Sequence, residues 1–148
     1  ELQVHADYYL ATDAGLIPTG ERAAVKGTPM DFTELSFVGE RIEGDFEALT
    51  SAGGYDHCWI LSEGEGVRPA AKLHDPKSGR SMEVFNDQPG VQFYAGNFLC
   101  DNPFGKRTGL CLEAEGFPDA PNQADFPNSI LRPGEVYEHT LVFRFLVD

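Results

Sequence analysis

The sequence has no long hydrophobic run, and this absence argues against an integral membrane protein. No stretch approaches the roughly 18 consecutive apolar residues that a membrane-spanning helix needs, and the N-terminus has no basic-then-apolar signal pattern. We therefore expect no membrane span and no membrane partner.

Positive charge is also scarce. Eleven Lys and Arg residues face 24 Asp and Glu residues, which gives a formal net charge of -13. Nucleic acids and anionic membrane surfaces bind basic patches, so this balance argues against both as partners. A neutral small molecule fits the composition better.

Cysteine is rare, and the three residues have no paired spacing. Cys58, Cys100 and Cys111 are an odd number, so the sequence predicts neither a disulfide framework nor a zinc site. We interpret all three as small, inert core residues. The lack of a disulfide pattern favours a cytoplasmic location.

Turn-forming residues, in contrast, are abundant and evenly spread. The 16 Gly and 10 Pro residues divide 148 residues into short apolar stretches, and no long segment keeps a helical apolar period. The chain is long enough for one hydrophobic core. The pattern therefore predicts a single all-β domain.

Two segments give the clearest strand signals. Residues 137–147 alternate, with Tyr137, Leu141, Phe143, Phe145 and Val147 on one face and polar residues on the other. Residues 71–75 and 80–85 flank the turn formers of 76–79, which is typical of a hairpin.

Alternation also sorts the candidate functional side chains by face. Gln92 and Tyr94 share one face of their segment, and Glu113 shares a face with Glu115. Asp56 lies on the face opposite His57, although the two are neighbours. A carboxylate on a half-buried strand needs a partner, a cation or a bound polyol, so Asp56 and Glu113 are candidates for a sugar site.

Several short motifs, taken in order, carry a resemblance to a known family. The motifs are LQVHADYYL at 2–10, LIPTGE at 16–21, GTPMDF at 27–32, GYDH at 54–57, PGVQFY at 89–94 with GNF at 96–98, CLE at 111–113, PDA at 118–120, FP at 126–127 and LRPGE at 131–135. Together they resemble the C-terminal half of the aldose 1-epimerase family, which includes the galactose mutarotases.

This resemblance implies a fold, a reaction and residue roles. It implies an antiparallel β-sandwich, here half of a larger supersandwich, that binds a free aldose such as galactose or glucose. By motif position, Glu113 corresponds to the general base, and Asp56 and Gln92 correspond to residues that bind sugar hydroxyls. Ring opening and closure would interconvert the α and β anomers, with no cofactor and no metal.

The resemblance also implies that part of the machinery lies elsewhere. The family's general acid is an upstream histidine, and none of His5, His57, His74 and His139 stands at its position. We expect residues 1–148 to be the C-terminal portion of a domain whose upstream half is a second chain or segment. Since a placed acid contributes roughly 10²- to 10⁴-fold, we expect the isolated chain to be nearly inactive, with uncovered apolar faces.

Two local departures from the family pattern affect the site. Residues 98–109 form a shorter loop than usual, so we expect a trimmed cleft wall and an altered sugar preference. Glu115 stands where the family often has Gln, and its negative charge is expected to raise the pKa of the base.

Other interpretations remain open at this level. The chain could be a fragment, a separately encoded half, or a degenerate relative that only binds carbohydrate. A glycoside hydrolase using Asp56 with Glu113 is a further alternative, which motif order disfavours.

Five side chains outside the candidate site have structural interpretations. We expect Asn97 and Asp119 to hold turns through side-chain to backbone hydrogen bonds. Arg107 with Lys106 is expected to be a surface charge, and Trp59 to lie in the core.

Overall fold

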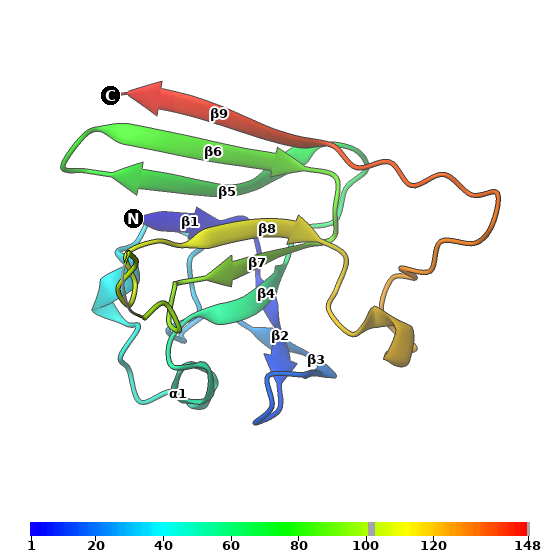
Figure 1. Ribbon diagram of the computed structural model, residues 1–148, viewed down its shortest axis with the longest axis horizontal. Coiled ribbons are helices and arrows are strands. Elements are labelled where there is room, and N and C mark those ends of the chain that lie inside the picture. The colour runs from blue at the N-terminus through cyan, green and yellow to red at the C-terminus, as the bar shows by residue number, and fades with distance from the viewer. Residues whose placement is uncertain (101–102, 148) are drawn as a thin grey trace.

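The structure is a computed structural model that describes residues 1–100 and 103–147, and almost all of its regular structure is β (Figure 1). One antiparallel sheet has the order β1-β5-β6-β9, with strands Leu2–Val4, Arg68–Asp75, Arg80–Asn86 and Leu141–Val147. The other has the order β3-β2-β4-β7-β8, with strands Pro18–Ala24, Tyr8–Thr12, Asp56–Ile60, Gly90–Tyr94 and Cys111–Glu115. The all-β prediction is confirmed.

Helix is confined to short connections in the described residues. A 3-10 turn, η1, covers Val38–Glu40, the single α-helix α1 covers Glu47–Ala52, and a second 3-10 turn, η2, covers Ala120–Asn122. No helix in the described part of the chain is long and apolar enough to cross a membrane. The sheets therefore determine where the side chains lie.

The core is an aromatic cluster between the two sheets. Phe93 is fully buried, and its ring centroid lies 5.4 Å from that of Tyr55, 6.0 Å from Trp59 and 6.1 Å from Phe32. Contacts at these separations combine large apolar burial with favourable ring geometry. Trp59 has no exposed surface, so its predicted place in the core is confirmed.

The hairpin predicted around residues 76–79 is also confirmed. Strands β5 and β6 pair antiparallel with Asp75 opposite Arg80. The Asp75 carboxylate accepts hydrogen bonds from the Lys77 amide at 3.1 Å and the Ser78 hydroxyl at 2.6 Å. Gly79 has a φ of 70°, which glycine adopts without steric cost. Local turn chemistry therefore suffices to place this hairpin.

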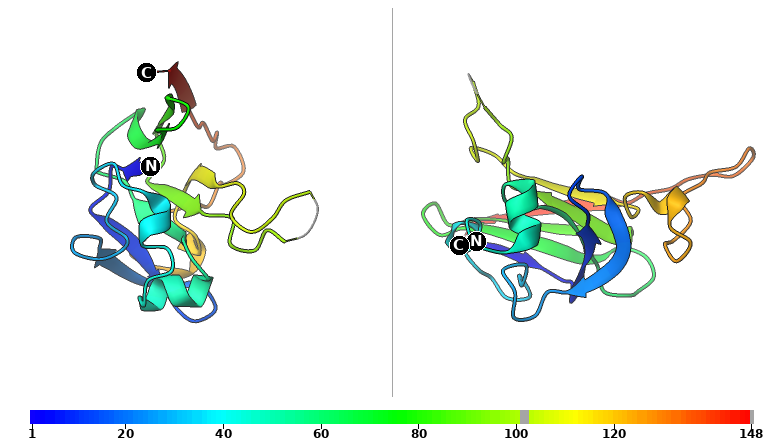
Figure 2. Two further views of the ribbon diagram at one scale, coloured as in Figure 1. Left: turned by 90° about the vertical axis from the view of Figure 1, so that its left-hand side faces the viewer. Right: turned by 90° about the horizontal axis from the view of Figure 1, so that it is seen from below.

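The last strand differs from its prediction at its beginning. β9 begins at Leu141 and not at Tyr137, because its ladder with β6 starts at the pair Asn86–Leu141. Just before it, the Thr140 amide donates to the Asp87 carboxylate at 2.9 Å. The extra four residues belong to an irregular connection that extends away from the sandwich (Figure 2).

The alternation predicted for β9 is correct, but its apolar face is open. Phe143 pairs with Val84, whose side chain is 1% exposed, yet Phe143 itself is 44% exposed and Phe145 is 73% exposed. On the opposite face, Arg144 pairs with Glu83. The five-stranded sheet therefore stops short of covering β9.

The cysteine interpretation holds for one residue of three. Cys58 is buried, whereas Cys100 and Cys111 are exposed free thiols. The prediction of core positions for the last two is wrong. Cys111 begins β8 on its exposed face, a position that pairing with β7 determines.

Replacing Phe93 with Ala tests the aromatic cluster. We expect Phe93→Ala to lower the free energy of unfolding by about 3–5 kcal/mol, because it removes a fully buried ring and leaves a cavity. Urea unfolding followed by the fluorescence of Trp59, the one tryptophan, measures it. As the control, Phe104→Ala removes a ring that is 61% exposed and should change stability by less than about 0.5 kcal/mol. Equal losses would contradict the assignment of the core.

Candidate functional site on the open face of the five-stranded sheet

Strands β4, β7 and β8 lie side by side, and their register decides which side chains meet. Cys58 pairs with Gln92, and Gln92 pairs with Glu113. Because residues directly opposite in a ladder share a face, these three side chains lie in one row. We call the surface formed by Asp56, Cys58, Gln92, Glu113 and Glu115 the polar face.

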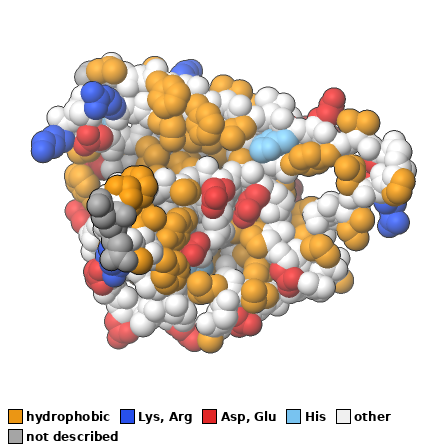
Figure 3. All heavy atoms as spheres, in the orientation of Figure 1, with side chains coloured by type: hydrophobic (Ala, Val, Ile, Leu, Met, Phe, Trp, Pro, Cys, Tyr) orange, Lys and Arg blue, Asp and Glu red, His pale blue; other side chains and the backbone are white. Residues whose placement is uncertain are grey.

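The structure brings together all three site residues predicted from the sequence. The Gln92 amide nitrogen donates a 2.8 Å hydrogen bond to Asp56 Oδ1. Gln92 lies directly opposite Glu113, whose side chain is exposed. Figure 3 shows acidic side chains gathered over β7 and β8 near the middle of the visible surface. The bond to Asp56 orients the Gln92 amide and leaves its oxygen available to a ligand.

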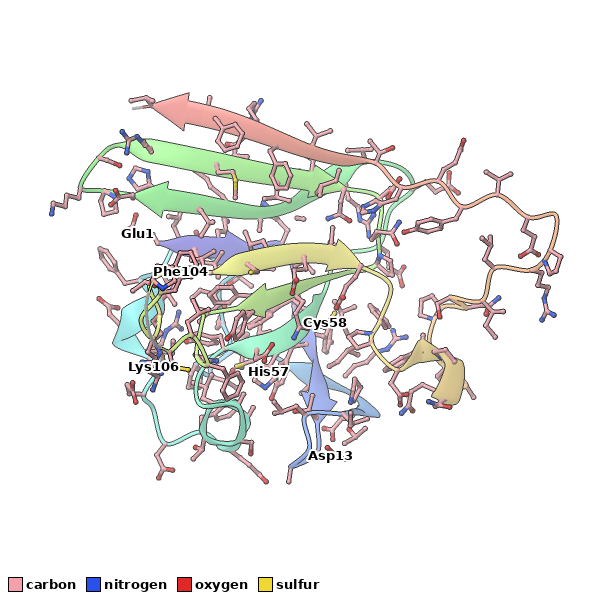
Figure 4. All side chains as sticks on the ribbon, in the orientation of Figure 1. Glu1, Asp13, His57, Cys58, Phe104 and Lys106 are labelled. Carbon is pink, nitrogen blue, oxygen red and sulfur yellow. The ribbon has the colours of Figure 1, made fainter. Side chains whose placement is uncertain are left out.

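His57 points away from this face, as alternation predicts. Its side chain is 1% exposed, and its ring lies 5.9 Å from the ring of Tyr9 and 6.4 Å from that of Trp59. Burial lowers the pKa of His57 to about 4, so the ring is neutral near pH 7. Figure 4 labels His57 and its neighbour Cys58 on β4. His57 is a core residue whose Nδ1 accepts a 3.1 Å hydrogen bond from the Asp56 backbone amide, and its ring faces away from the Asp56 carboxylate.

Glu115 occupies the more enclosed part of the polar face. Its Oε1 atom is buried and has no hydrogen-bond partner among the described residues. Burial first, and then the charge of Glu113, raise the pKa of Glu115 to about 7, although a hydrogen bond from Cys58 opposes the shift. Burial also raises the pKa of the Cys58 thiol, with Glu115 adding to the effect. Glu115 therefore keeps its proton to a higher pH than an ordinary glutamate does.

Gly90 makes room for this part of the face. It pairs with Glu115, and a Cβ atom at Gly90 would lie 2.6 Å from Cys58 Sγ and 3.3 Å from the Phe117 ring. Since the thiol is itself buried, it has little space to move aside. Any larger residue would push Cys58 or Phe117 out of place.

An aromatic pair borders the other end of the polar face. Tyr94 pairs with Asp56 across the ladder, and its ring stacks on Phe98 with centroids 6.3 Å apart and planes 18° apart. The Phe98 amide donates to the Tyr94 hydroxyl at 3.0 Å, which holds the two together. Phe98 is 61% exposed. A flat apolar surface therefore stands beside the hydrogen-bonding groups.

Two predictions about the surrounding loops need correction. The Asn97 side chain does bond to backbone, but its amide donates to the carbonyls of Tyr55 at 2.9 Å and Ala52 at 3.3 Å, more than 40 residues away. Arg107 is no free surface charge, because it pairs with Glu43 and donates to the Gly53 carbonyl at 3.0 Å. Both side chains tie the β7–β8 connection to the start of β4. No local signal marks them, since their partners are distant in sequence.

Asp119 lies in a turn, as predicted. The hydrogen bonds to its carboxylate come from side chains, whereas the sequence predicted bonds between the side chain and the backbone. Asp119 has a φ of 60°, and its carboxylate accepts hydrogen bonds from the side chains of Asn122 and Gln123. Gln123 also reaches the Pro18 carbonyl at 3.0 Å. This hydrogen bond links the turn to the first residue of β3.

The site is an open face and not an enclosed cavity. A cavity of about 620 Å³ lies nearby, lined by Val38, Ile42, Ala95 and Arg107 among others. It contains none of the polar-face carboxylates, so we place the site on the sheet surface.

The arrangement first defines a class of protein. A β-sandwich that presents carboxylates, an oriented amide and an exposed aromatic ring on one face has the chemistry that binds polar ring-shaped ligands such as sugars. Residues 1–144 match the family model described as Aldose 1-epimerase. The chain belongs to the aldose 1-epimerase family.

Individual relatives agree with this assignment. The chain is 43% identical over 154 residues to galactose mutarotase from Homo sapiens, covering 99% of this chain and 44% of that protein. It is 33% identical over 157 residues to aldose 1-epimerase from Escherichia coli (strain K12), covering 100% of this chain and 45% of that protein. The chain thus spans under half the length of these curated relatives.

A solved structure shows the same architecture. The crystal structure of galactose 1-epimerase from Lactobacillus acidophilus NCFM superimposes with a TM-score of 0.86 at 30% identity, covering 99% of this chain and 43% of that one. An aldose epimerase homologue from C. elegans gives a TM-score of 0.80 at 23% identity, which supports the fold alone. The predicted antiparallel β-sandwich is confirmed.

The pKa values of His57 and Glu115 predict opposite effects of pH on stability. Between about pH 4 and 6.5 the unfolded chain binds more protons at His57, so stability from this residue is lost as pH falls. Between about pH 4.5 and 7 the folded chain binds more protons at Glu115, so stability from this residue is lost as pH rises.

Urea unfolding between pH 4 and 7.5 separates the contribution of His57 to stability from that of Glu115. The stability of the wild type relative to His57→Gln should rise with pH by up to about 3 kcal/mol between pH 4 and 6.5. The stability of the wild type relative to Glu115→Gln should fall between pH 4.5 and 7. Differences that do not change with pH would contradict both assignments.

Proposed function

We propose that this chain forms part of an aldose 1-epimerase that interconverts the α and β anomers of a free hexose, galactose or glucose, and that it supplies the base and part of the sugar site. One observation carries the proposal. Glu113 lies directly opposite Gln92, which is hydrogen-bonded to Asp56, on a single open face.

The chemistry fits these groups. The Glu113 carboxylate accepts the proton of the anomeric hydroxyl while an acid protonates the ring oxygen, so that the C1–O5 bond breaks and an aldehyde forms. Rotation about C1–C2 presents the other face of the carbonyl, and the reverse proton transfers close the ring. Asp56 and Gln92 hold hydroxyl groups so that the open sugar stays in place.

The resemblance to the family implies that the acid for this reaction is a histidine, and no histidine of the described residues lies on the polar face. His57 faces the core, and the other three histidines lie on or next to β1, β5 and β9 of the four-stranded sheet. The polar face itself carries a base and hydrogen-bonding groups. We therefore propose that a segment beyond these 148 residues supplies the acid.

The same segment would cover the open part of the four-stranded sheet. A cavity of about 600 Å³ is lined by Leu73, Met82 and Phe145 on that sheet and by Val38 and Leu110 on the other side. Hydrophobic side chains are also visible over β5, β6 and β9 (Figure 3). Because the relatives are more than twice as long as this chain, we propose that a further part of the protein, as the same or a second polypeptide, occupies this surface.

Replacing Glu113 tests the proposed base. In the protein extended by the upstream half, Glu113→Gln should slow the mutarotation of fresh α-galactose or α-glucose by about 10²- to 10⁴-fold, because the amide cannot accept the proton. Polarimetry measures the rate. The 148-residue chain alone should give a rate near that of buffer.

The matched control is Glu138→Gln, an exposed acidic residue outside the polar face, which should leave the rate unchanged. Equal rates for wild type and Glu113→Gln would remove Glu113 from the mechanism. Release of reducing sugar from a glycoside would instead establish hydrolysis.

A second candidate function has one observation in its favour. The stacked pair of Tyr94 and the 61% exposed Phe98 offers a platform on which a sugar ring could bind without reacting. Measurable galactose binding by the extended protein with no acceleration of anomer exchange would favour a carbohydrate-binding protein over an epimerase.

The open apolar face predicts self-association of the isolated chain. At micromolar concentration, sedimentation velocity should show association, because Phe143 and Phe145 expose large apolar surfaces on an edge strand. The double variant Phe143→Ser with Phe145→Ser should sediment as a monomer. A monomeric wild type would argue against a surface that needs a cover.

A further inference from the structure

We propose that Glu115 is a positioning residue of the polar face, which holds a proton beside Glu113 near neutral pH so that only one carboxyl of the pair is charged. The effect of this proton on sugar chemistry rests on the proposed function. The sharing of one charge between Glu113 and Glu115 is independent of the proposed function.

The geometry of β8 places the two carboxyls together. Glu113 and Glu115 are two residues apart on one strand face, which corresponds to about 7 Å along the strand. Glu113 is exposed and Glu115 is half-buried. Of the pair, Glu115 therefore loses more solvation when it ionises.

The surroundings of Glu115 offer little compensation for a negative charge. Among the described residues it forms no ion pair, and its Oε1 atom is buried without a donor. A buried carboxyl oxygen in this situation favours the protonated form. The raised pKa of Glu115 agrees with this conclusion.

Within the described part of the chain, the neighbouring strands supply one donor to Glu115 and no cation, since the hydrogen bond from the Cys58 thiol is the one contribution that lowers the pKa of Glu115. β4 contributes the Cys58 thiol and, further along the face, the Asp56 carboxyl, while β7 contributes Gly90 and the uncharged Gln92. On β3, the Arg22 guanidinium lies 5.9 Å from the centroid of the Phe117 ring and donates to the Asp125 carbonyl. This contact directs Arg22 to other partners than Glu115.

The proton on Glu115 has a consequence for the proposed reaction. When Glu113 takes the proton from the anomeric hydroxyl, negative charge develops on the sugar oxygen. A neutral Glu115 adds no repulsion there, whereas an ionised Glu115 places a second negative charge close by. The reaction should therefore slow as Glu115 ionises.

The first experiment measures the pair directly in the 148-residue chain. Carbon-13 NMR of the Glu side-chain carboxyls should show Glu115 titrating near pH 7, and Glu113→Gln should lower that midpoint by removing the neighbouring charge. Glu138→Gln, away from the face, should not move it. A Glu115 midpoint at the ordinary value of about 4.3, or one that ignores Glu113→Gln, would overturn the proposal.

The second experiment measures mutarotation of galactose in the extended protein. The wild-type rate should fall about fivefold or more between pH 6 and 8.5, whereas Glu115→Gln, which stays neutral, should keep its rate. The two should agree within about twofold at pH 6. Parallel pH profiles would overturn the role in catalysis.

The two experiments separate the two proposals. A coupled NMR titration without any mutarotation would remove the proposed function and leave the carboxyl pair intact. Active mutarotation with an ordinary Glu115 midpoint would remove the proposed carboxyl pair and leave the proposed function intact.

Discussion

The antiparallel register of β4, β7 and β8 is the constraint on which the rest of the site depends. It aligns Cys58, Gln92 and Glu113 in one row and brings Asp56 within hydrogen-bond distance of Gln92. Because side chains alternate between faces, a slip of one residue in any of these strands would send its polar side chains into the aromatic core. The buried rings of Tyr55, Trp59 and Phe93 oppose such a slip, since it would expose them.

The same core explains why the polar face can hold unfavourable charges. A well-packed aromatic cluster on one side of the sheet tolerates a half-buried carboxyl on the other, because the cost at Glu115 is small beside the apolar area buried behind it. Long-range contacts add rigidity. Asn97 and Arg107 tie the β7–β8 connection to the segment before β4, so the end of the polar face near Asp56 and Tyr94 is held by bonds between distant residues.

The four-stranded sheet has the opposite character. Its inner face is buried under the five-stranded sheet at β1 and at Val84 of β6, but it is open at β9, where Phe143 and Phe145 contact little. A sandwich whose layers are offset, so that an edge strand of one layer extends past the other, is unbalanced in apolar burial. This imbalance agrees with a chain that spans under half the length of its curated relatives.

The sequence by itself determined the features that depend on local pattern. Turn chemistry predicted the hairpin at 76–79, alternation separated Asp56 from His57, and ordered motifs indicated the family. Tertiary structure alone decided the rest. The start of β9 depends on where β6 ends, the exposure of Cys111 depends on its neighbour β7, and the state of Glu115 depends on burial beside Cys58. The physical reason is that alternation assigns a side chain to a face, whereas strand pairing and packing decide which face is covered and which charges meet there.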